Sequence, residues 1–122
     1  MKKKSFLYFA TNYNNVLKIG HTTALYARKS QLKNIEGLHY FRSFEFRGDR
    51  IKRELYESLL RYAIESIYPV KPYNIDHFEA DARTIQKVDF AWDDICKAIE
   101  QEENNIKRAL KRKINTNITG EL

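Results

Sequence analysis

The chain has 122 residues, a formal net charge of +6 at pH 7 and a pI near 9.4. This length is typical of one domain, which buries about two-thirds of the surface of its unfolded chain. A single cysteine, Cys96, excludes an internal disulfide framework and a cysteine-rich zinc site. No apolar run approaches the length that spans a bilayer, and no signal-peptide segment follows the N-terminal lysines. The sequence therefore predicts a cytoplasmic protein that is not secreted and does not bind a membrane.

The basic excess is concentrated in the first two-thirds of the chain. Residues 1–78 carry 14 Lys and Arg against 7 Asp and Glu, whereas residues 79–122 carry 8 against 9. Such a surface attracts anionic partners, although many small proteins carry a solvated basic face without one. Because the basic part coincides with the polar residues described below, the sequence favours a nucleic-acid partner.

Two short runs rich in aromatic and β-branched residues, at 5–11 and 16–21, predict a β-hairpin. Asparagines in the turn between them favour this structure, because Asn tolerates the left-handed backbone conformation and bonds to its own backbone. A helix is expected to follow at about 24–34, with Thr22 and Thr23 as its cap.

Residues 38–47 have the clearest strand pattern, with an apolar face at every second position. This segment is expected to complete a three-stranded antiparallel sheet. Asp49 then predicts the N-cap of a helix at about 50–67. The side chains expected to face the core from this helix are Ile51, Leu55, Leu59, Tyr62, Ala63 and Ile67.

Pro69 and Pro72 end that helix and predict an extended segment that runs back across the sheet. Residues 80–112 contain neither Gly nor Pro and carry apolar side chains at helical spacing, which predicts one long helix with a basic end. The expected fold class is therefore α/β (α+β), with a small three-stranded antiparallel sheet, flanking helices and a long C-terminal helix. Residues 1–79 are expected to form the core, and residues 80–122 a helical extension packed on it.

Four polar residues, Tyr8, Lys18, His21 and Arg28, lie on the predicted hairpin and the first turns of the following helix, so we expect them to converge. The LYF run around Tyr8, the KIG run that starts at Lys18 and the helix residue Arg28 resemble the motifs of the GIY-YIG nuclease superfamily. Lysine in place of the second motif's tyrosine is similar to the phage- and virus-type branch. The resemblance implies a GIY-YIG-like core and, for a viral protein, a location in the host cytoplasm or nucleus.

The resemblance also implies a metal site. The superfamily's metal-ligand glutamate lies on a helix that follows a strand, and Glu54 matches this position, with Glu57 as the competitor. Glu54 would then hold one Mg²⁺ or Mn²⁺, with waters completing the coordination shell. The alternative interpretation is that Glu54 pairs with Arg50 or Ser58 on a solvated helix surface, an interaction worth about 0.3–0.5 kcal/mol.

The other motif residues have chemical roles in the resemblance. Arg28 is expected to contact the scissile phosphate through the paired donors of its guanidinium. Tyr8 is expected to act as a general base on the attacking water, and Lys18 to lower its pKa from the ordinary value of about 10. Lys18 and His21 are further candidates for contact with the water or for proton transfer. Ordinary structural positions are the alternative for each of them.

Two later runs resemble motifs of different branches of the superfamily. The run from Tyr73 to Ile75 resembles the late asparagine motif of some homing-type members, and the run from Asp76 to Glu79 resembles the acidic ending of the phage type. The contribution of Asn74, Asp76 and Glu79 to the site is left open.

The function implied by these features is that of a metal-dependent endonuclease, a hydrolase that cleaves DNA phosphodiester bonds; the sequence does not distinguish DNA from RNA as the substrate. One rival is a non-catalytic DNA-binding module of the same fold. Another is a protein-interaction module that uses the long C-terminal helix, through which two copies of the chain would also form a homodimer. The cations expected to contact DNA are Lys29, Lys33, Lys107, Arg108, Lys111 and Arg112.

Overall fold

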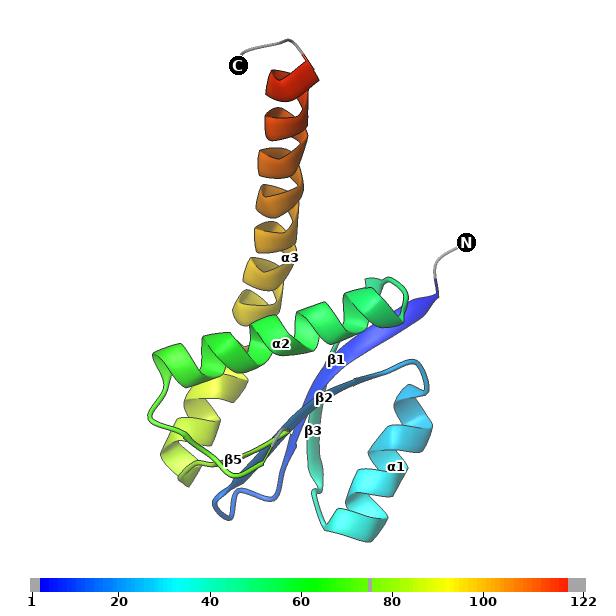
Figure 1. Ribbon diagram of the computed structural model, residues 1–122. Coiled ribbons are helices and arrows are strands. Elements are labelled where there is room, and N and C mark those ends of the chain that lie inside the picture. The colour runs from blue at the N-terminus through cyan, green and yellow to red at the C-terminus, as the bar shows by residue number, and fades with distance from the viewer. Residues whose placement is uncertain (1–2, 75, 119–122) are drawn as a thin grey trace.

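The computed structural model describes residues 3–74 and 76–118 of the chain, which form an α+β fold (Figure 1). The strands are β1 (Lys4–Thr11), β2 (Val16–Thr22), β3 (Tyr40–Arg47), β4 (Lys71–Pro72) and β5 (His77–Glu79). The helices are α1 (Leu25–Glu36), α2 (Arg50–Ile67) and α3 (Ala82–Ile118). No helix in this part of the chain is long and apolar enough to cross a membrane.

The sheet of the described residues has five antiparallel strands in the order β3-β1-β2-β5-β4, so the prediction of three strands is wrong in number. The three predicted strands lie together, and β1 pairs with both β2 and β3. The other two come from the segment after α2, which the prolines keep extended, so that its backbone pairs with the edge of β2. Pro72 lies in the outermost strand, where a missing N–H costs no ladder hydrogen bond.

Two hydrophobic clusters lie on opposite faces of this sheet. The larger one joins alternate side chains of the central strands to α2 and α3. Trp92 of α3 is fully buried there, makes an edge-to-face contact with Phe9 at 5.0 Å and donates its indole N–H to the carbonyl oxygen of Ser43. The smaller cluster lies between the sheet and α1 and includes Tyr8 and Leu32. Tyr8 therefore lies on the α1 side of the sheet.

The predicted core-facing side of α2 is wrong for four of its six residues, whereas Leu59 and Ala63 do pack against the core. Its buried side chains are Tyr56, Leu60 and Ile64, whereas Ile51, Leu55, Tyr62 and Ile67 are exposed and Leu59 and Ala63 are half-buried. These three residues, which are four positions apart, face the core because the large ring of Tyr56 packs against Phe46 of β3, with the ring centroids 4.5 Å apart. The helix is thus rotated from the prediction by one residue, or about 100°.

The cap of α1 also differs from the prediction. Thr22 accepts a hydrogen bond from the backbone N–H of Ala24, which shapes the turn before the helix, but no side chain caps α1 itself. At the other end, Gly37 adopts a left-handed conformation with φ of 69° and donates its N–H to the carbonyl oxygen of Leu32. The helix consequently extends through Glu36, and this last residue reaches the candidate site.

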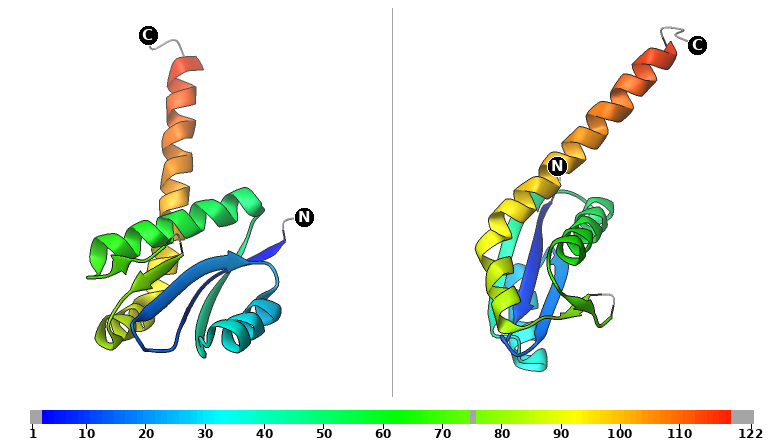
Figure 2. Two further views of the ribbon diagram at one scale, coloured as in Figure 1. Left: turned by 60° about the horizontal axis from the view of Figure 1, so that its bottom comes forward. Right: turned by 90° about the vertical axis from the view of Figure 1, so that its left-hand side faces the viewer.

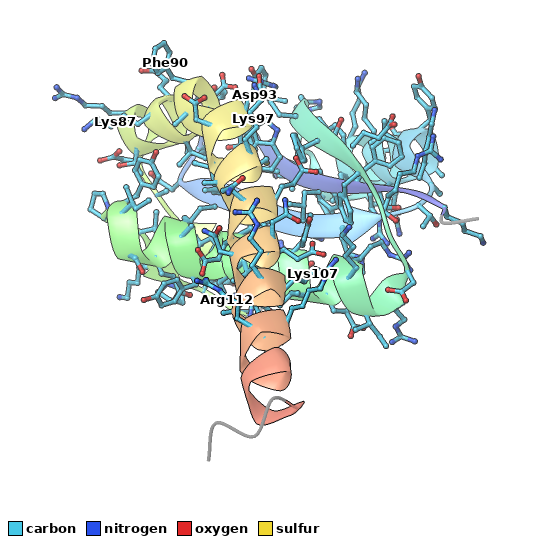
Figure 3. The ribbon with its side chains drawn as sticks, turned by 90° about the horizontal axis from the view of Figure 1, so that it is seen from above. Lys87, Phe90, Asp93, Lys97, Lys107 and Arg112 are labelled. Atoms are coloured by element: carbon cyan, nitrogen blue, oxygen red, sulfur yellow. The ribbon has the colours of Figure 1, made fainter. Side chains whose placement is uncertain are left out.

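The long predicted helix is confirmed as α3. Its first half contributes Ile85, Val88 and Trp92 to the larger cluster, and Cys96 is buried there as well. Phe90 points outward from this half of the helix, with 95% of its surface exposed (Figure 3). The second half of α3 extends beyond the rest of the molecule (Figure 2).

Candidate active site

Tyr8 and Gly20 form the base of the candidate site. They face each other across the β1–β2 pair, and Tyr8 is only 3% exposed. The ring of Tyr8 stacks on Phe41 of β3 with the centroids 5.3 Å apart. A Cβ atom on Gly20 would lie within the van der Waals radius of the Tyr8 ring and hydroxyl. The KIG motif therefore ends in glycine because only glycine lets the tyrosine lie against the strand.

We expect Gly20→Ala to destabilise the fold by about 1–3 kcal/mol, because the added methyl group forces the Tyr8 ring out of its position. Chemical denaturation measures this cost. The control is the same substitution in a Tyr8→Ala background, in which the clash is absent and the cost should largely disappear. An equal cost in both backgrounds would contradict the steric explanation.

Charged groups from three segments influence the pKa of Tyr8. Burial raises the pKa of Tyr8 to about 12, and the Arg28 guanidinium of α1 opposes this rise. The carboxylates of Asp76, Glu57 of α2 and Glu36 of α1 add to it. Tyr8 is consequently a neutral hydroxyl at neutral pH, and the expected lowering of its pKa by Lys18 is not observed.

Lys18 belongs to a separate ion-pair network. Its ammonium lies 2.6 Å from a carboxylate oxygen of Glu36 and 3.9 Å from Asp76, and the residue is 8% exposed. His77 contacts the same two carboxylates, Glu36 through Nε2 at 3.3 Å and Asp76 through Nδ1 at 2.8 Å. Burial alone would raise the pKa of Glu36, but its contacts with Lys18 and His77 lower it below the ordinary value. The network joins the end of α1 to β2 and β5.

The later motif residues surround this network. Asn74 accepts hydrogen bonds from the backbone N–H groups of Asp76 and His77, which shapes the entry into β5. Ile75 lies outside the described residues. Glu79 lines a neighbouring cleft of about 440 Å³, whose wall also includes Tyr73 and His77. Asp76 is thus the member of this group whose charge acts on Tyr8.

His21 does not join the other polar residues on one face. It pairs with Leu7 across the hairpin and therefore points to the α2 side of the sheet, opposite to Tyr8. Burial lowers the pKa of His21, Arg53 and Arg28 lower it further, and Glu54 opposes them. Arg28 acts on both Tyr8 and His21 and so links the two faces.

The edge of β2 is only partly covered by β5. β5 pairs with residues 16–18 of β2, and the carbonyl oxygen of Asp76 accepts the N–H of Ile19. Beyond Ile19, no strand in the described part of the chain covers that edge. Charges on α1 and α2 accordingly both act on Tyr8 and on His21, although these two side chains lie on opposite faces of the sheet.

The rotation of α2 reverses the order of the two metal-ligand candidates. Glu54 is 53% exposed at its side chain and bonds with Arg50 at 3.0 Å, which is the surface pair named as its alternative. Glu57 is 24% exposed and lies 3.7 Å from Arg61. Burial raises the pKa of Glu57, and Asp76 adds to this shift. The sequence ranked Glu57 second because its periodicity placed the wrong stripe of α2 on the sheet.

The six cations expected to contact DNA form two groups rather than one patch. Lys29 and Lys33 are exposed on α1, and the other four lie on the projecting half of α3 (Figures 1 and 3). Lys107 is paired with Glu103 of the same helix at 2.6 Å. The two groups lie at different ends of the molecule, so one short duplex does not touch both groups unless it crosses the body.

Comparisons of the chain with protein-family models, curated proteins and solved structures found no match. Among the described residues there is also no cluster of three or more His, Cys, Asp or Glu side chains suited to hold a metal ion. The function is therefore inferred from the side chains of the site.

Proposed function

We propose that the chain is a metal-dependent endonuclease of the GIY-YIG type that hydrolyses DNA phosphodiester bonds. The observation that carries this proposal is the set of charges around Tyr8: the Arg28 guanidinium and the partly buried Glu57 carboxylate both act on its buried hydroxyl. Phosphodiester hydrolysis needs an anion-binding group, a cation and a positioned water. Arg28 would bind the anion, Glu57 would hold the cation and Tyr8 would position the water.

Arg28 is available to bind a phosphate. Its side chain is half-buried, and it forms no ion pair within residues 3–74 and 76–118. A guanidinium presents planar paired donors that suit two phosphate oxygens better than a lysine ammonium does. Partial burial strengthens the attraction because water screens the charges less.

Glu57 suits a hard divalent cation such as Mg²⁺ or Mn²⁺. Its pKa is raised by burial and by the neighbouring Asp76, so the negative charge at this point is incompletely compensated by Arg61. A cation held by one carboxylate keeps most of its waters, as Mg²⁺ commonly does. When bound, the cation would polarise the phosphate and make a water molecule more acidic.

Tyr8 would orient the attacking water through its hydroxyl. With a pKa of about 12 it is a poor base by itself, since little phenolate exists at neutral pH. The carboxylates that raise this pKa include Glu57, the proposed metal ligand, so compensation of their charge would bring the pKa of Tyr8 down. Lys18 would act indirectly, by fixing Glu36 and Asp76 beside the site.

The same pKa also favours one rival, a DNA-binding module that has kept the fold without cleavage. The deciding experiment incubates the purified chain with supercoiled plasmid and Mg²⁺ or Mn²⁺. We expect nicked or linear DNA, and EDTA should stop its formation. DNA binding without cleavage in either metal, on duplex, branched or RNA substrates, would leave the binding module as the function.

Binding of DNA is expected to be electrostatic and largely independent of sequence, because the chain offers cations but no evident base-reading helix. Truncation after Asn105 removes five cations at the end of α3, namely Lys107, Arg108, Lys111, Arg112 and Lys113. The logarithm of affinity should then fall less steeply with the logarithm of salt, by up to about 0.9 for each phosphate that these cations neutralise in the full chain. Fluorescence anisotropy at several salt concentrations measures both slopes.

The matched control is a full-length variant with Lys29 and Lys33 changed to glutamine, which tests the α1 group separately. An unchanged slope after truncation would mean that the cations at the end of α3 are solvated and do not contact DNA. Light scattering of the same truncated protein tests the homodimer, because the truncation also removes Ile106 and Leu110, which are 42% and 57% exposed.

A further inference from the structure

A cleft of about 440 Å³ opens where β5 meets the end of α1 and the turn between β1 and β2. Its volume lies within the range of about 300–1,000 Å³ that is usual for the binding site of a small ligand. The cleft shares Glu36 and His77 with the ion-pair network of Lys18, but Tyr8 is not part of its lining. It is therefore a separate site that adjoins the candidate active site.

The cleft lies on the same side of the sheet as Tyr8. Val16 of β2 lines the cleft and pairs with Glu79 of β5. Alternate residues of a strand share a face, so Val16 lies on the same face as Gly20, the partner of Tyr8. Val16 also packs against the smaller hydrophobic cluster, which contains Tyr8. Val16 and Gly20 are four positions apart, which corresponds to about 13 Å along the strand. A nucleic-acid strand bound at Tyr8 would therefore pass close to the cleft.

Two rings, those of Tyr73 and His77, line one side of the cleft. The backbone N–H of Tyr73 donates to the carbonyl oxygen of His77 at 2.9 Å, and the ring centroids lie 6.3 Å apart at an angle of 81°. The His77 ring is held by Glu36 at 3.3 Å and by Asp76 at 2.8 Å. Tyr73, in contrast, is 73% exposed. Its ring is therefore available to stack on a planar ligand.

The remaining polar groups of the cleft indicate which planar ligand fits. Asn12 and Asn15 are exposed in the turn between β1 and β2, and Glu79 is exposed on β5. The described residues that line the cleft include no Lys or Arg, and the Glu79 carboxylate forms no ion pair in the described part of the chain. A carboxylate without a neighbouring cation repels phosphate. Amide and carboxylate groups, however, form hydrogen bonds with the edges of bases. The part of a nucleic acid that suits this cleft is therefore an uncharged base.

We propose that the cleft binds one unpaired base of the nucleic-acid strand held at Tyr8, with the base stacked on Tyr73 and its edge bonded to Glu79. The proposal rests on the proposed function in taking a nucleic acid as the ligand. Unpaired bases are commonly recognised by such stacking on aromatic side chains together with hydrogen bonds to their edges. Guanine suits the cleft best, because its N1–H and N2–H groups are adjacent donors that one carboxylate accepts together. A fully paired duplex offers no such base, so its binding remains independent of sequence.

The experiment measures the affinity of the full chain for three labelled duplexes by fluorescence anisotropy, with EDTA present so that no cleavage occurs. The duplexes share one sequence: the first is fully paired, the second has one extra unpaired guanine, and the third has an abasic residue in place of that guanine. The abasic duplex keeps the flexible backbone but lacks the base. We expect the guanine duplex to bind about tenfold more tightly than the abasic duplex, which is the effect of one base–aromatic stack.

Three variants test the residues of the cleft. Tyr73→Ala should reduce the ratio of the two affinities to below about twofold, whereas Tyr73→Phe keeps the ring and should preserve the ratio. Tyr62→Ala is the matched control, because Tyr62 of α2 is 72% exposed and lines a different groove, and it should leave the ratio unchanged. Glu79→Gln should weaken binding of the guanine duplex without affecting the abasic duplex.

The proposal would be overturned by equal affinity for the guanine and abasic duplexes, by an unchanged ratio in Tyr73→Ala, or by an equal loss in Tyr62→Ala. Micromolar guanosine that removes the preference for the guanine duplex would also overturn it, because the cleft would then bind a free nucleoside. Cleavage is measured separately with metal present. A chain that prefers the unpaired guanine without cleaving DNA contradicts the nuclease, whereas cleavage without this preference contradicts the base-binding cleft.

Discussion

Arg28→Ala is expected to lower the rate of DNA cleavage by about 10²–10³ while leaving the fold intact. The half-buried guanidinium has no ion pair in the described residues, so its removal breaks no salt bridge there. It would, however, remove the group that stabilises charge on the reacting phosphate. Because Arg28 holds the pKa of Tyr8 down, its loss should also raise that pKa further. Both effects slow the reaction, and single-turnover rates at saturating protein separate them from weaker binding.

Two variants complete this test. Lys29→Ala removes the adjacent cation of α1, which is exposed, and should reduce DNA affinity slightly without changing the single-turnover rate. Arg28→Lys keeps the charge but not the paired donors, so its rate should lie between those of the wild type and the alanine variant. If Arg28→Ala cleaves as fast as the wild type, Arg28 does not contact the scissile phosphate.

Much of the fold follows from short-range patterns. The strands at 5–11 and 16–21 are marked by runs of aromatic and β-branched residues, and the turn asparagines lie between them. Asp49 caps α2 by accepting the N–H of Lys52, as predicted. The sequence did not predict the two additional strands, because β4 and β5 have two and three residues and are too short to show a period. Their pairing depends on an available edge of β2, which is a property of the assembled sheet.

The candidate site was predictable where it is local and not where it depends on packing. Tyr8 and Gly20 face each other because they are paired across one hairpin. The partner of Lys18 is Glu36, 18 positions away, which reaches it only because α1 runs farther than expected. The rotation of α2 makes Glu57 more buried than Glu54, and its charge acts on Tyr8; apolar residues on two sides of that helix made the rotation ambiguous.

The second variant with a large expected effect is at Glu57, whose side chain the rotation of α2 makes more buried than that of Glu54. Glu57→Gln is expected to remove metal-dependent cleavage, because loss of the cation's transition-state stabilisation by several kcal/mol corresponds to on the order of 10³ in rate. The fold should tolerate the change, since the amide has the same shape and burial already disfavours the charged carboxylate. Isothermal calorimetry with Mn²⁺ should show the same loss in binding, which a purely structural role would not produce.

Glu54→Gln is the matched control on the same helix. Its carboxylate is half exposed and paired with Arg50, so its loss should change the cleavage rate by less than about twofold and the stability by less than about 1 kcal/mol.

The pH dependence of cleavage gives an independent test of Glu57 as the metal ligand. The raised pKa of Glu57 means that protons compete with the metal at a higher pH than for an ordinary glutamate, so cleavage should decline early as the pH falls, with excess Mn²⁺ shifting the decline to lower pH. If Glu54→Gln loses cleavage activity and Glu57→Gln keeps it, Glu54 is the metal ligand. If both variants keep cleavage activity, Glu79 is the next carboxylate to test.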